Sequence, residues 1–349
     1  MSSLAHYTIR IFIYFTVRYN SPTMKKLSVA LVIPTIRSLD FLSVWGSRLS
    51  EISLYVIEDH KTRELETPTL HSSKIFHYSW EDIRKEFGKD EWIFSRKNAG
   101  IRSYGFWKAY RNGADVIVTL DDDCFPTDDD LVAGHLDNLS YKTPERWMSV
   151  YPDPKHLYTR GFPYKIREKN RTVISHGLWS GALDQDARTE VVTGKLHEKP
   201  YPPLRMTVPT GLFFPMSSMN LAFSREITPC MFFPMMGYDP EGKAWGFDRY
   251  DDIWAGIFAK KVCDHLGLSV VSGSPFVDHR KASDPAANLL KEKAGLAMNE
   301  DFWKRVDAVR LTKNTPALCY RELAEKIVFP RLPYFTALKK AMQIWAHLF

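Results

Sequence analysis

The chain has 349 residues, of which 44% are hydrophobic and 25% charged, with 47 Lys and Arg against 41 Asp and Glu. These proportions are typical of a globular protein, and the length allows one large α/β domain or two ordinary ones. The small excess of basic residues argues against a nucleic-acid binder, which concentrates basic charge far more strongly, and it suits an anionic small substrate.

No segment resembles a membrane span, which needs about 20 apolar residues. The longest candidate, residues 11–17, is too short and lies between Arg10 and Arg18. The four cysteines are far apart and form no C-x-x-C pair, which is typical of reduced thiols and indicates neither a zinc site nor a disulfide framework. We therefore predict a cytoplasmic protein without a transmembrane segment.

The sequence divides into three predicted parts. Residues 1–23 precede Met24 and a strand-like run, so we interpret them as a disordered extension or as an over-read upstream of the true start. Residues 24–310 contain the strand and helix patterns of the main domain. Residues 311–349 form a helical segment with an apolar stripe, which packs either on the body or on a partner. The stripe consists of Leu338, Met342, Trp345 and Phe349.

The main domain opens with a predicted β-α-β unit. An apolar strand over 27–33 ends at Pro34 and Thr35, a helix follows over 41–49, and a second strand over 53–57 ends in Glu58 and Asp59. This order predicts a parallel sheet, and an acid after the second strand is well placed to meet a nucleoside. Neither G-x-G-x-x-G after the first strand nor G-x-x-x-x-G-K-[ST] occurs, so we predict no flavin, NAD or P-loop site.

A basic group comes next, at the start of a helix predicted from about Ser95 to Tyr110. Arg96, Lys97 and Arg102 lie near its amino end, where free N–H groups and the helix dipole favour phosphate. The alternative is a solvated basic face without a ligand.

The most informative stretch is the apolar run 115–120, which ends in Asp121, Asp122 and Asp123. The run is typical of a buried parallel strand, and open α/β sheets bind ligands at the carboxyl ends of such strands. A divalent cation that also binds substrate phosphates is one interpretation, because hard cations prefer carboxylate oxygens. A solvated acidic turn is the other.

Two later segments offer further candidates. The loop 158–167 places Arg160 and Arg167 among aromatic rings, which suits a phosphorylated sugar or base as well as it suits an ordinary surface loop. Asp251 and Asp252 begin a predicted helix, and two acids exceed what a helix cap requires, so we consider them as a catalytic base.

Colinear motifs along the chain allow a family comparison. They are Ile33–Leu42, Asp121–Phe125, Arg160–Gly161 with Pro163, Ser175–Trp179, Phe214–Met216, Met219–Phe223, Arg249–Gly256, Cys263–Leu268, His279 with Lys281–Ser283, Cys319–Ala324 and Pro333–Thr336. With these motifs the chain resembles the reversibly glycosylated polypeptide family, whose plant members include UDP-arabinopyranose mutases. The resemblance runs from about Leu27 to the tail.

The resemblance implies a GT-A-like glycosyltransferase fold, which has a Rossmann-like, mostly parallel sheet, here with C-terminal helices. It also implies that a UDP-sugar binds with Mn²⁺ or Mg²⁺ and without flavin or NAD. The implied metal ligands are Asp121, Asp123 and His279. The implied UDP-sugar contacts are Pro34, Thr35, Glu58, Asp59, Lys97, Arg102, Asp121, Asp122 and Asn220. The implied catalytic group is Arg160, Arg167, Asp251 and Asp252.

Arg160 matches the position that is reversibly glycosylated in plant members, and Arg167 matches a second arginine required there. Arg160 is then either a covalent carrier, deprotonated by Asp251 or Asp252, or a clamp for the diphosphate. The implied reaction is the conversion of UDP-arabinopyranose to UDP-arabinofuranose. A metal-dependent glycosyltransferase with an external acceptor is the alternative, and a non-catalytic partner subunit is a third reading.

Departures from the plant pattern leave the sugar open. They lie at Asp59–Lys61, Ser217, Asp278 and the added segment Tyr238–Ala244. The resemblance also implies a homo- or hetero-oligomer.

Overall fold

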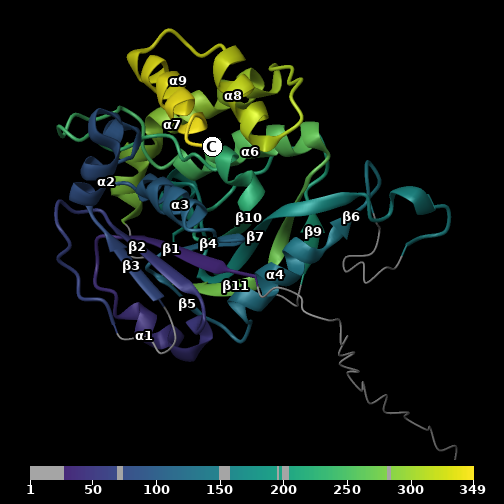
Figure 1. Cartoon of the computed structure of the whole chain (residues 1–349), viewed down its shortest axis with the longest axis horizontal. Coiled ribbons are helices and arrows are strands. Elements are labelled where there is room, and N and C mark those ends of the chain that lie inside the picture. The colour runs from purple at the N-terminus through teal and green to yellow at the C-terminus, as the bar shows by residue number, and fades with distance from the viewer. Residues whose placement is uncertain (1–26, 69–73, 149–157, 195, 199–203, 281–283) are drawn as a thin grey trace, which may run out of the picture.

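The computed structural model describes residues 27–68, 74–148, 158–194, 196–198, 204–280 and 284–349. The predicted extension 1–23 lies outside the described residues. One twisted sheet crosses the molecule, and helices cover both of its faces (Figure 1). The strands are β1 (Val29–Thr35), β2 (Ser53–Glu58), β3 (Lys74–Tyr78), β4 (Val116–Leu120), β5 (Cys124–Pro126), β6 (Lys142–Thr143), β7 (Asn170–Ala182), β8 (His197–Glu198), β9 (Arg205–Thr207), β10 (Asn220–Ser224) and β11 (Ser269–His279).

The sheet is mixed, in the order β3-β2-β1-β4-β10-β7-β11-β5. Neighbours among β3, β2, β1 and β4 are parallel, and so are β7 and β11. β10 runs antiparallel between β4 and β7, and β5 runs antiparallel to β11. The parallel β-α-β start and the central sheet flanked by helices confirm the predicted fold class.

Side chains along β1 point alternately to the two faces of the sheet, which explains why a hydrophobic core lies on each face. Val29, Leu31 and Ile33 pack into one hydrophobic core, whereas Ala30 and Val32 pack into the core on the other face. The helices are α1 (Phe41–Trp45), α2 (Trp80–Phe87), α3 (Arg102–Arg111), α4 (Leu131–Ser140), α5 (Ala187–Thr193), α6 (Asp251–Leu266), α7 (Pro285–Asp307), α8 (Pro316–Lys326) and α9 (Pro333–Ala346). In the described residues, no helix combines the length and apolar character that a bilayer crossing requires.

Pro34 lies inside β1 and does not end it as predicted. Pairing with β4 stops at Val32, whereas pairing with β2 continues to Thr35. The Thr35 carbonyl accepts from the Asp59 N–H on the β2 side, so the backbone of the adjacent Pro34 faces the β4 side, where pairing has ended and the missing N–H interrupts no ladder. As a result, β1 delivers Thr35 to the carboxyl edge of the sheet.

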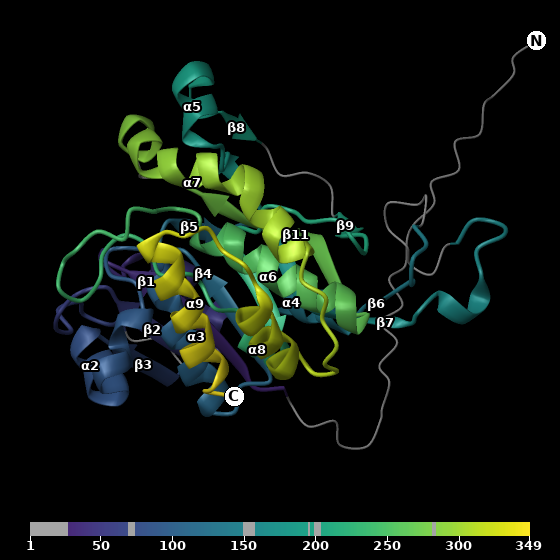
Figure 2. The ribbon, with the colours of Figure 1, turned by 90° about the horizontal axis from the view of Figure 1, so that it is seen from above.

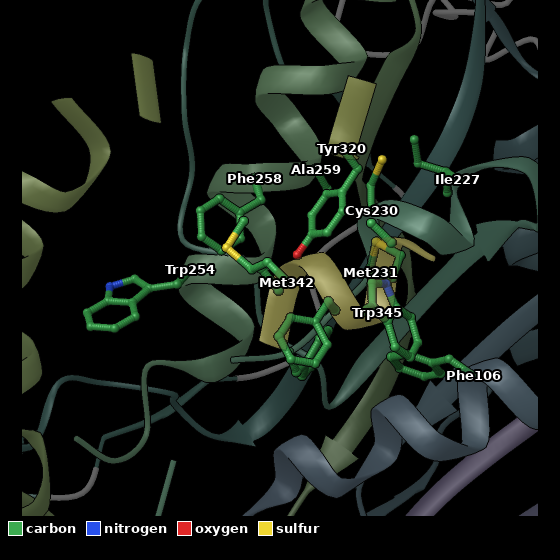
Figure 3. Packing of buried hydrophobic residues seen from close by; sticks show 14 of the residues in the cluster. Phe106, Ile227, Cys230, Met231, Trp254, Phe258, Ala259, Tyr320, Met342 and Trp345 are labelled. Atoms are coloured by element: carbon green, nitrogen blue, oxygen red, sulfur yellow. The ribbon is translucent and has the colours of Figure 1, made fainter. Parts of the chain in front are cut away.

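The C-terminal stripe packs on the body, one of the two arrangements expected for it. Leu338, Met342 and Trp345 are fully buried. The Trp345 ring contacts Phe94 and Phe232, and its Nε1 donates to the Pro229 carbonyl at 2.9 Å. Figure 3 shows Met342 and Trp345 among the buried side chains of this core. Figure 2 shows α8 and α9 lying over the layer that contains α3 and α6. The tail thus completes the larger core.

Replacing Trp345 with alanine should lower the free energy of unfolding by about 3–5 kcal/mol, because a fully buried aromatic ring leaves a cavity that neighbours fill only in part. Urea unfolding measures the change. Val328→Ala is the control, since Val328 is 73% exposed and surface substitutions usually stay within about 0.5 kcal/mol. Equal losses for the two variants would contradict the packing of α9.

Candidate functional site

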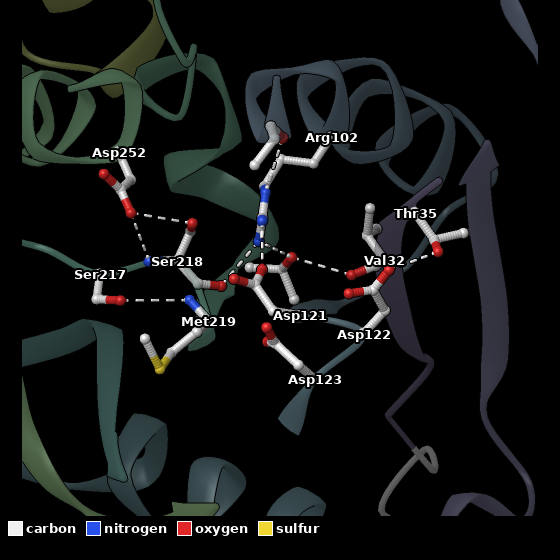
Figure 4. Close-up of polar contacts among 12 residues, drawn as sticks. Val32, Thr35, Arg102, Asp121, Asp122, Asp123, Ser217, Ser218, Met219 and Asp252 are labelled. Atoms are coloured by element: carbon white, nitrogen blue, oxygen red, sulfur yellow. Dashed lines mark hydrogen bonds and ion pairs between the residues drawn. The ribbon is translucent and has the colours of Figure 1, made fainter. Parts of the chain in front are cut away.

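The centre of the site is Asp121, the first residue after β4, together with Arg102 of α3. Arg102 is fully buried, and its Nη2 donates to Asp121 Oδ1. Its other donors reach the Ala99 carbonyl, the Thr119 hydroxyl and the Ser218 carbonyl at 2.8–3.0 Å (Figure 4). The predicted phosphate contact is therefore not the role that this geometry gives Arg102. Because its side chain is inaccessible and its donors are engaged, it orients Asp121 instead.

Asp122 and Asp123 are held by Thr35, the last residue of β1, and by Arg37, two residues beyond it. The Thr35 hydroxyl donates to Asp122 Oδ2 at 2.6 Å, and the Arg37 guanidinium forms a fork on both Asp122 oxygens. Arg37 Nη2 also lies 3.4 Å from Asp123 Oδ2. Burial raises the pKa of Asp122, and the Thr35 hydrogen bond and the Arg37 charge oppose that rise. Thr35 thus positions an acid and has no hydroxyl proton left for a nucleoside.

His279 meets the acidic triplet through strand pairing. It is the last residue of β11, and it pairs with Cys124 of β5, the residue after Asp123. Its Nδ1 donates to the Ala182 carbonyl at 2.8 Å. A neutral ring with that hydrogen bond keeps its lone pair on Nε2, which lies 3.9 Å from Asp123 Oδ1. The predicted neighbours Asp123 and His279 are therefore brought together.

These residues fit a divalent cation in part. A carbonyl that orients the imidazole is the usual support for a histidine ligand, and His279 is only 6% exposed. Asp123 Oδ1 and the second oxygen of Asp121 are not used by Arg37 or Arg102. Yet among the described residues no three His, Cys, Asp or Glu side chains are already gathered around a metal position. Substrate phosphate oxygens would have to supply further ligands.

The amino end of α6 adds two more acids. Asp252 Oδ2 accepts from the Ser218 N–H at 3.0 Å and from the Ser218 hydroxyl at 3.1 Å. Since the Ser218 carbonyl accepts from Arg102, one backbone segment links Asp252 to Asp121 (Figure 4). Asp251 is buried, and its Oδ2 has no hydrogen-bond partner in the structure.

Burial controls the protonation of both acids. It raises the pKa of Asp252 to about 6, assisted by the charge of Asp184 and opposed by Ser218. Burial also raises the pKa of Asp251 well above that of an ordinary carboxyl, and the neighbouring Asp252 charge adds to the rise. Asp252 is therefore the carboxyl poised to exchange a proton near neutral pH.

The predicted nucleoside contacts Glu58 and Asp59 are engaged within the protein. Glu58 accepts from the N–H groups of Glu64 and Leu65 and contacts His77 Nε2 at 2.7 Å. Asp59 accepts from Trp80 Nε1 at 2.7 Å and from the Asn98 N–H at 2.9 Å. Both side chains hold loops around the edge of the sheet, which argues against direct contact with ribose.

Three other predicted UDP-sugar contacts also have different surroundings. Pro34 is buried within β1. Asn220 is fully buried; its amide nitrogen donates to the carbonyls of Leu178 and Pro275, and its oxygen contacts His135. Lys97 is exposed, with its ammonium 5.7 Å from the Tyr238 ring centroid. Asn220 therefore stabilises the strands beneath the site through its hydrogen bonds. Lys97 lies beside the added segment Tyr238–Ala244.

Arg160 and Arg167 lie at the opposite edge of the sheet. The segment that carries them, residues 158–169, precedes Asn170, the amino end of β7, and lies beside β6 (Figure 1). Through β10, His176 of β7 is level with Thr119 of β4, so the acidic triplet lies beyond His176, which is itself six residues and about 20 Å from Asn170 at about 3.3 Å per residue. Arg160 is exposed, and Arg167 stacks between Tyr158 and Tyr164. This structure does not bring either arginine to the aspartates.

Sequence reasoning missed Arg37 and Ser218. Arg37 could have been found, because it stands two residues beyond the end of β1, a parallel neighbour of β4 at the same edge. Ser218 gave no such signal, since its position depends on hydrogen bonds to residues far away in sequence.

Fold and site together define the class: a GT-A-like α/β domain with an acidic strand end at the ligand-binding edge. Residues 24–349 match the family model described as reversibly glycosylated polypeptide, so the chain belongs to that family.

Curated relatives agree with this assignment. "Probable UDP-arabinopyranose mutase 4" of Arabidopsis thaliana is 38% identical, with 90% of this chain and 88% of the relative covered. "UDP-arabinopyranose mutase 1" of Oryza sativa subsp. japonica is 37% identical, with 93% and 91% covered. "UDP-arabinopyranose mutase 1" of Arabidopsis thaliana is 36% identical, with 93% of each covered.

Arg102→Met should cost about 3–5 kcal/mol of unfolding free energy, because the Ala99 and Ser218 carbonyls lose their donor and Asp121, whose side chain is 30% exposed, loses its counter-ion. Arg102→Met combined with Asp121→Asn should recover part of that loss, since the uncompensated charge is gone. Urea unfolding measures both. Arg171→Gln is the control, because this 60% exposed arginine pairs with Glu226 at the surface, where such a pair contributes at most about 1 kcal/mol. If Arg102→Met loses no more unfolding free energy than Arg171→Gln, the role of Arg102 in holding Asp121 is refuted.

Proposed function

We propose that the chain is a UDP-sugar mutase that interconverts pyranose and furanose forms, with UDP-L-arabinopyranose and UDP-L-arabinofuranose as the pair. The observation that carries the proposal is the meeting of Asp123 and His279, beside two arginines, at the ligand edge of a chain whose curated relatives are named for this reaction. A nucleotide diphosphate is the anion that such an edge suits.

We also propose that Asp121, Asp123 and His279 hold Mn²⁺ or Mg²⁺ and that flavin and NAD take no part. A cation held by these residues would supply positive charge that stabilises the diphosphate as a leaving group. The chain's own contribution is to fix the acids: Arg102 orients Asp121, and the Ala182 carbonyl orients His279. The acids therefore require little reorganisation when the diphosphate departs.

The reaction needs a proton transfer but no oxidant. During isomerisation the bond from C1 to the pyranose ring oxygen breaks, a bond from C1 to the oxygen on C4 forms, and the C4 hydroxyl proton ends on the former ring oxygen. UDP leaves and is recaptured, so all atoms are conserved. Asp252 is the side chain that we propose takes and returns this proton, because it lies one hydrogen-bonded segment from Asp121 and has a raised pKa.

The proposed proton transfer assigns no step to Arg160, and its role as a covalent carrier or as a clamp for the diphosphate stays a prediction from the sequence. The proposed chemistry therefore relies on Asp252 and the residues around Ser218. The cytoplasmic location and assembly into a homo- or hetero-oligomer stay predictions from the sequence.

Incubating the purified protein with UDP-arabinopyranose and Mn²⁺ should yield a UDP-arabinofuranose peak on chromatography of the nucleotide sugars. Asp123→Ala should remove this activity, whereas Asp128→Ala, which alters an exposed acid nearby, should retain it. A full rate for Asp123→Ala would refute the cation site. Release of UDP only after an acceptor is added would instead identify a glycosyltransferase.

The pH profile of kcat/KM should rise through about pH 6 and level off above it, because Asp252 must be ionised to accept a proton. Asp252→Asn should lower kcat by about 10²- to 10⁴-fold and remove this limb. Ser218→Ala should move the limb to higher pH, since the hydroxyl hydrogen bond favours the ionised form. An unmoved limb would contradict the assignment.

The same carboxyl makes stability depend on pH. Its folded pKa lies above the unfolded value, so its favourable contribution is present at low pH and is lost as the pH rises through about 6. Asp252→Asn should therefore flatten the fall in urea midpoint between about pH 4 and 6.

A further inference from the structure

We infer that Arg37 is an exchangeable counter-ion. Without ligands, its guanidinium neutralises Asp122 and Asp123 in place of the divalent cation. When the cation and the nucleotide bind, the guanidinium moves to the nucleotide diphosphate. The inference rests on the proposed diphosphate site, and it assigns a role to a residue that the mechanism above does not use. Its consequence is that cation and nucleotide bind cooperatively.

The two arginines of the site differ in how firmly they are held. Arg102 has no exposed surface, and it donates to two backbone carbonyls and a hydroxyl as well as to Asp121. The Arg37 side chain is 47% exposed, and its contacts in the described structure are the carboxylates of Asp122 and Asp123. Arg102 is built into the core, whereas Arg37 can leave by rotation of its side chain alone.

Arg37 occupies oxygens on the side where a cation would bind. The carboxylates of Asp122 and Asp123 are only 5% and 16% exposed, so water neutralises them poorly. Arg37 uses Asp123 Oδ2, and the other oxygen of the same carboxylate faces His279 Nε2. A divalent ion between Asp123 and His279 would therefore lie next to the guanidinium, and the two positive charges would repel each other.

The diphosphate gives the displaced guanidinium a new partner. Arginine binds phosphate oxygens through the same two-pronged geometry that it uses on carboxylates. The backbone of Arg37 is fixed, because its N–H donates to the Thr35 hydroxyl at 3.0 Å, so the side chain swings from an anchored point at the edge of the sheet. The bound nucleotide thus lowers the free-energy cost of moving Arg37 away from the carboxylates, which favours binding of the cation. By the same coupling, the bound cation increases the affinity for the nucleotide.

The competing explanation is that Arg37 only forms an ordinary surface ion pair with the aspartates. The chain contains a comparable surface pair that can serve as a control. Arg171 makes a two-pronged contact with Glu226 at 2.7 and 2.9 Å and is 60% exposed, but it lies near the amino end of β7. Arg171→Gln removes the same chemistry far from the site, so it separates a local effect from a change in overall charge.

The experiment measures Mn²⁺ binding by electron paramagnetic resonance of the free ion, with and without UDP, for the wild type, Arg37→Gln, Arg37→Lys and Arg171→Gln. Without UDP, Arg37→Gln should bind Mn²⁺ about five- to tenfold more tightly than the wild type. UDP should strengthen Mn²⁺ binding to the wild type by a larger factor than to Arg37→Gln. Arg37→Lys, which keeps the charge, should stay near the wild type, and Arg171→Gln should match it.

Unchanged or weaker Mn²⁺ binding by Arg37→Gln would overturn the inference, and so would the absence of Mn²⁺ binding by every variant. Thermal unfolding of each variant verifies that it is folded, and Arg37→Ala, which also removes the charge, repeats the comparison if Arg37→Gln is not. No sugar turnover enters these measurements. If the mutase assay fails while Arg37→Gln still tightens Mn²⁺ binding, the proposed reaction falls and the counter-ion role stands.

Discussion

The ion pair between the fully buried Arg102 and the partly exposed Asp121 is the interaction on which the site depends. Arg102 begins α3, and its guanidinium has partners in three segments: the turn just before α3, the end of β4 and the segment before β10. A buried charge with unused donors costs several kcal/mol, so these segments must come together in one arrangement for Arg102 to be satisfied. That arrangement places Ser218, and through it Asp252, beside the acidic triplet.

The triplet also shows how a protein keeps three adjacent carboxylates in place before any ligand arrives. Arg102 faces Asp121 and Arg37 faces Asp122 and Asp123, so two positive charges stand against three negative ones. Burial raises the pKa of Asp123, the Asp121 charge adds to the rise, and His279 and Arg37 oppose it. The repulsion that suggested a cation from the sequence is thus largely met by arginines, and the remaining negative charge lies on the side of His279.

Much of this arrangement was predictable where the signal is local. The apolar run before Asp121 predicts a buried strand, and the carboxyl ends of parallel strands share an edge, so the acidic triplet was correctly placed there. The roles of Glu58, Asp59 and Asn220 were not predictable, because sequence shows a polar residue but not its partners. Those partners are Trp80, His77 and His135 among others, and their positions are set by tertiary packing.

The strand order has a further consequence for the acidic triplet. From β4 the hydrogen-bonded path runs through β10, β7 and β11 to β5, and residues 121–123 join β5 back to β4. The three aspartates are therefore the covalent link that closes a ring of strands. A connection of this kind looks like a flexible turn in the sequence, yet it cannot lengthen or swing without breaking the ring. A ligand that binds at this edge would meet acids whose spacing is already set, so the entropy of ordering them is lost during folding and not during binding.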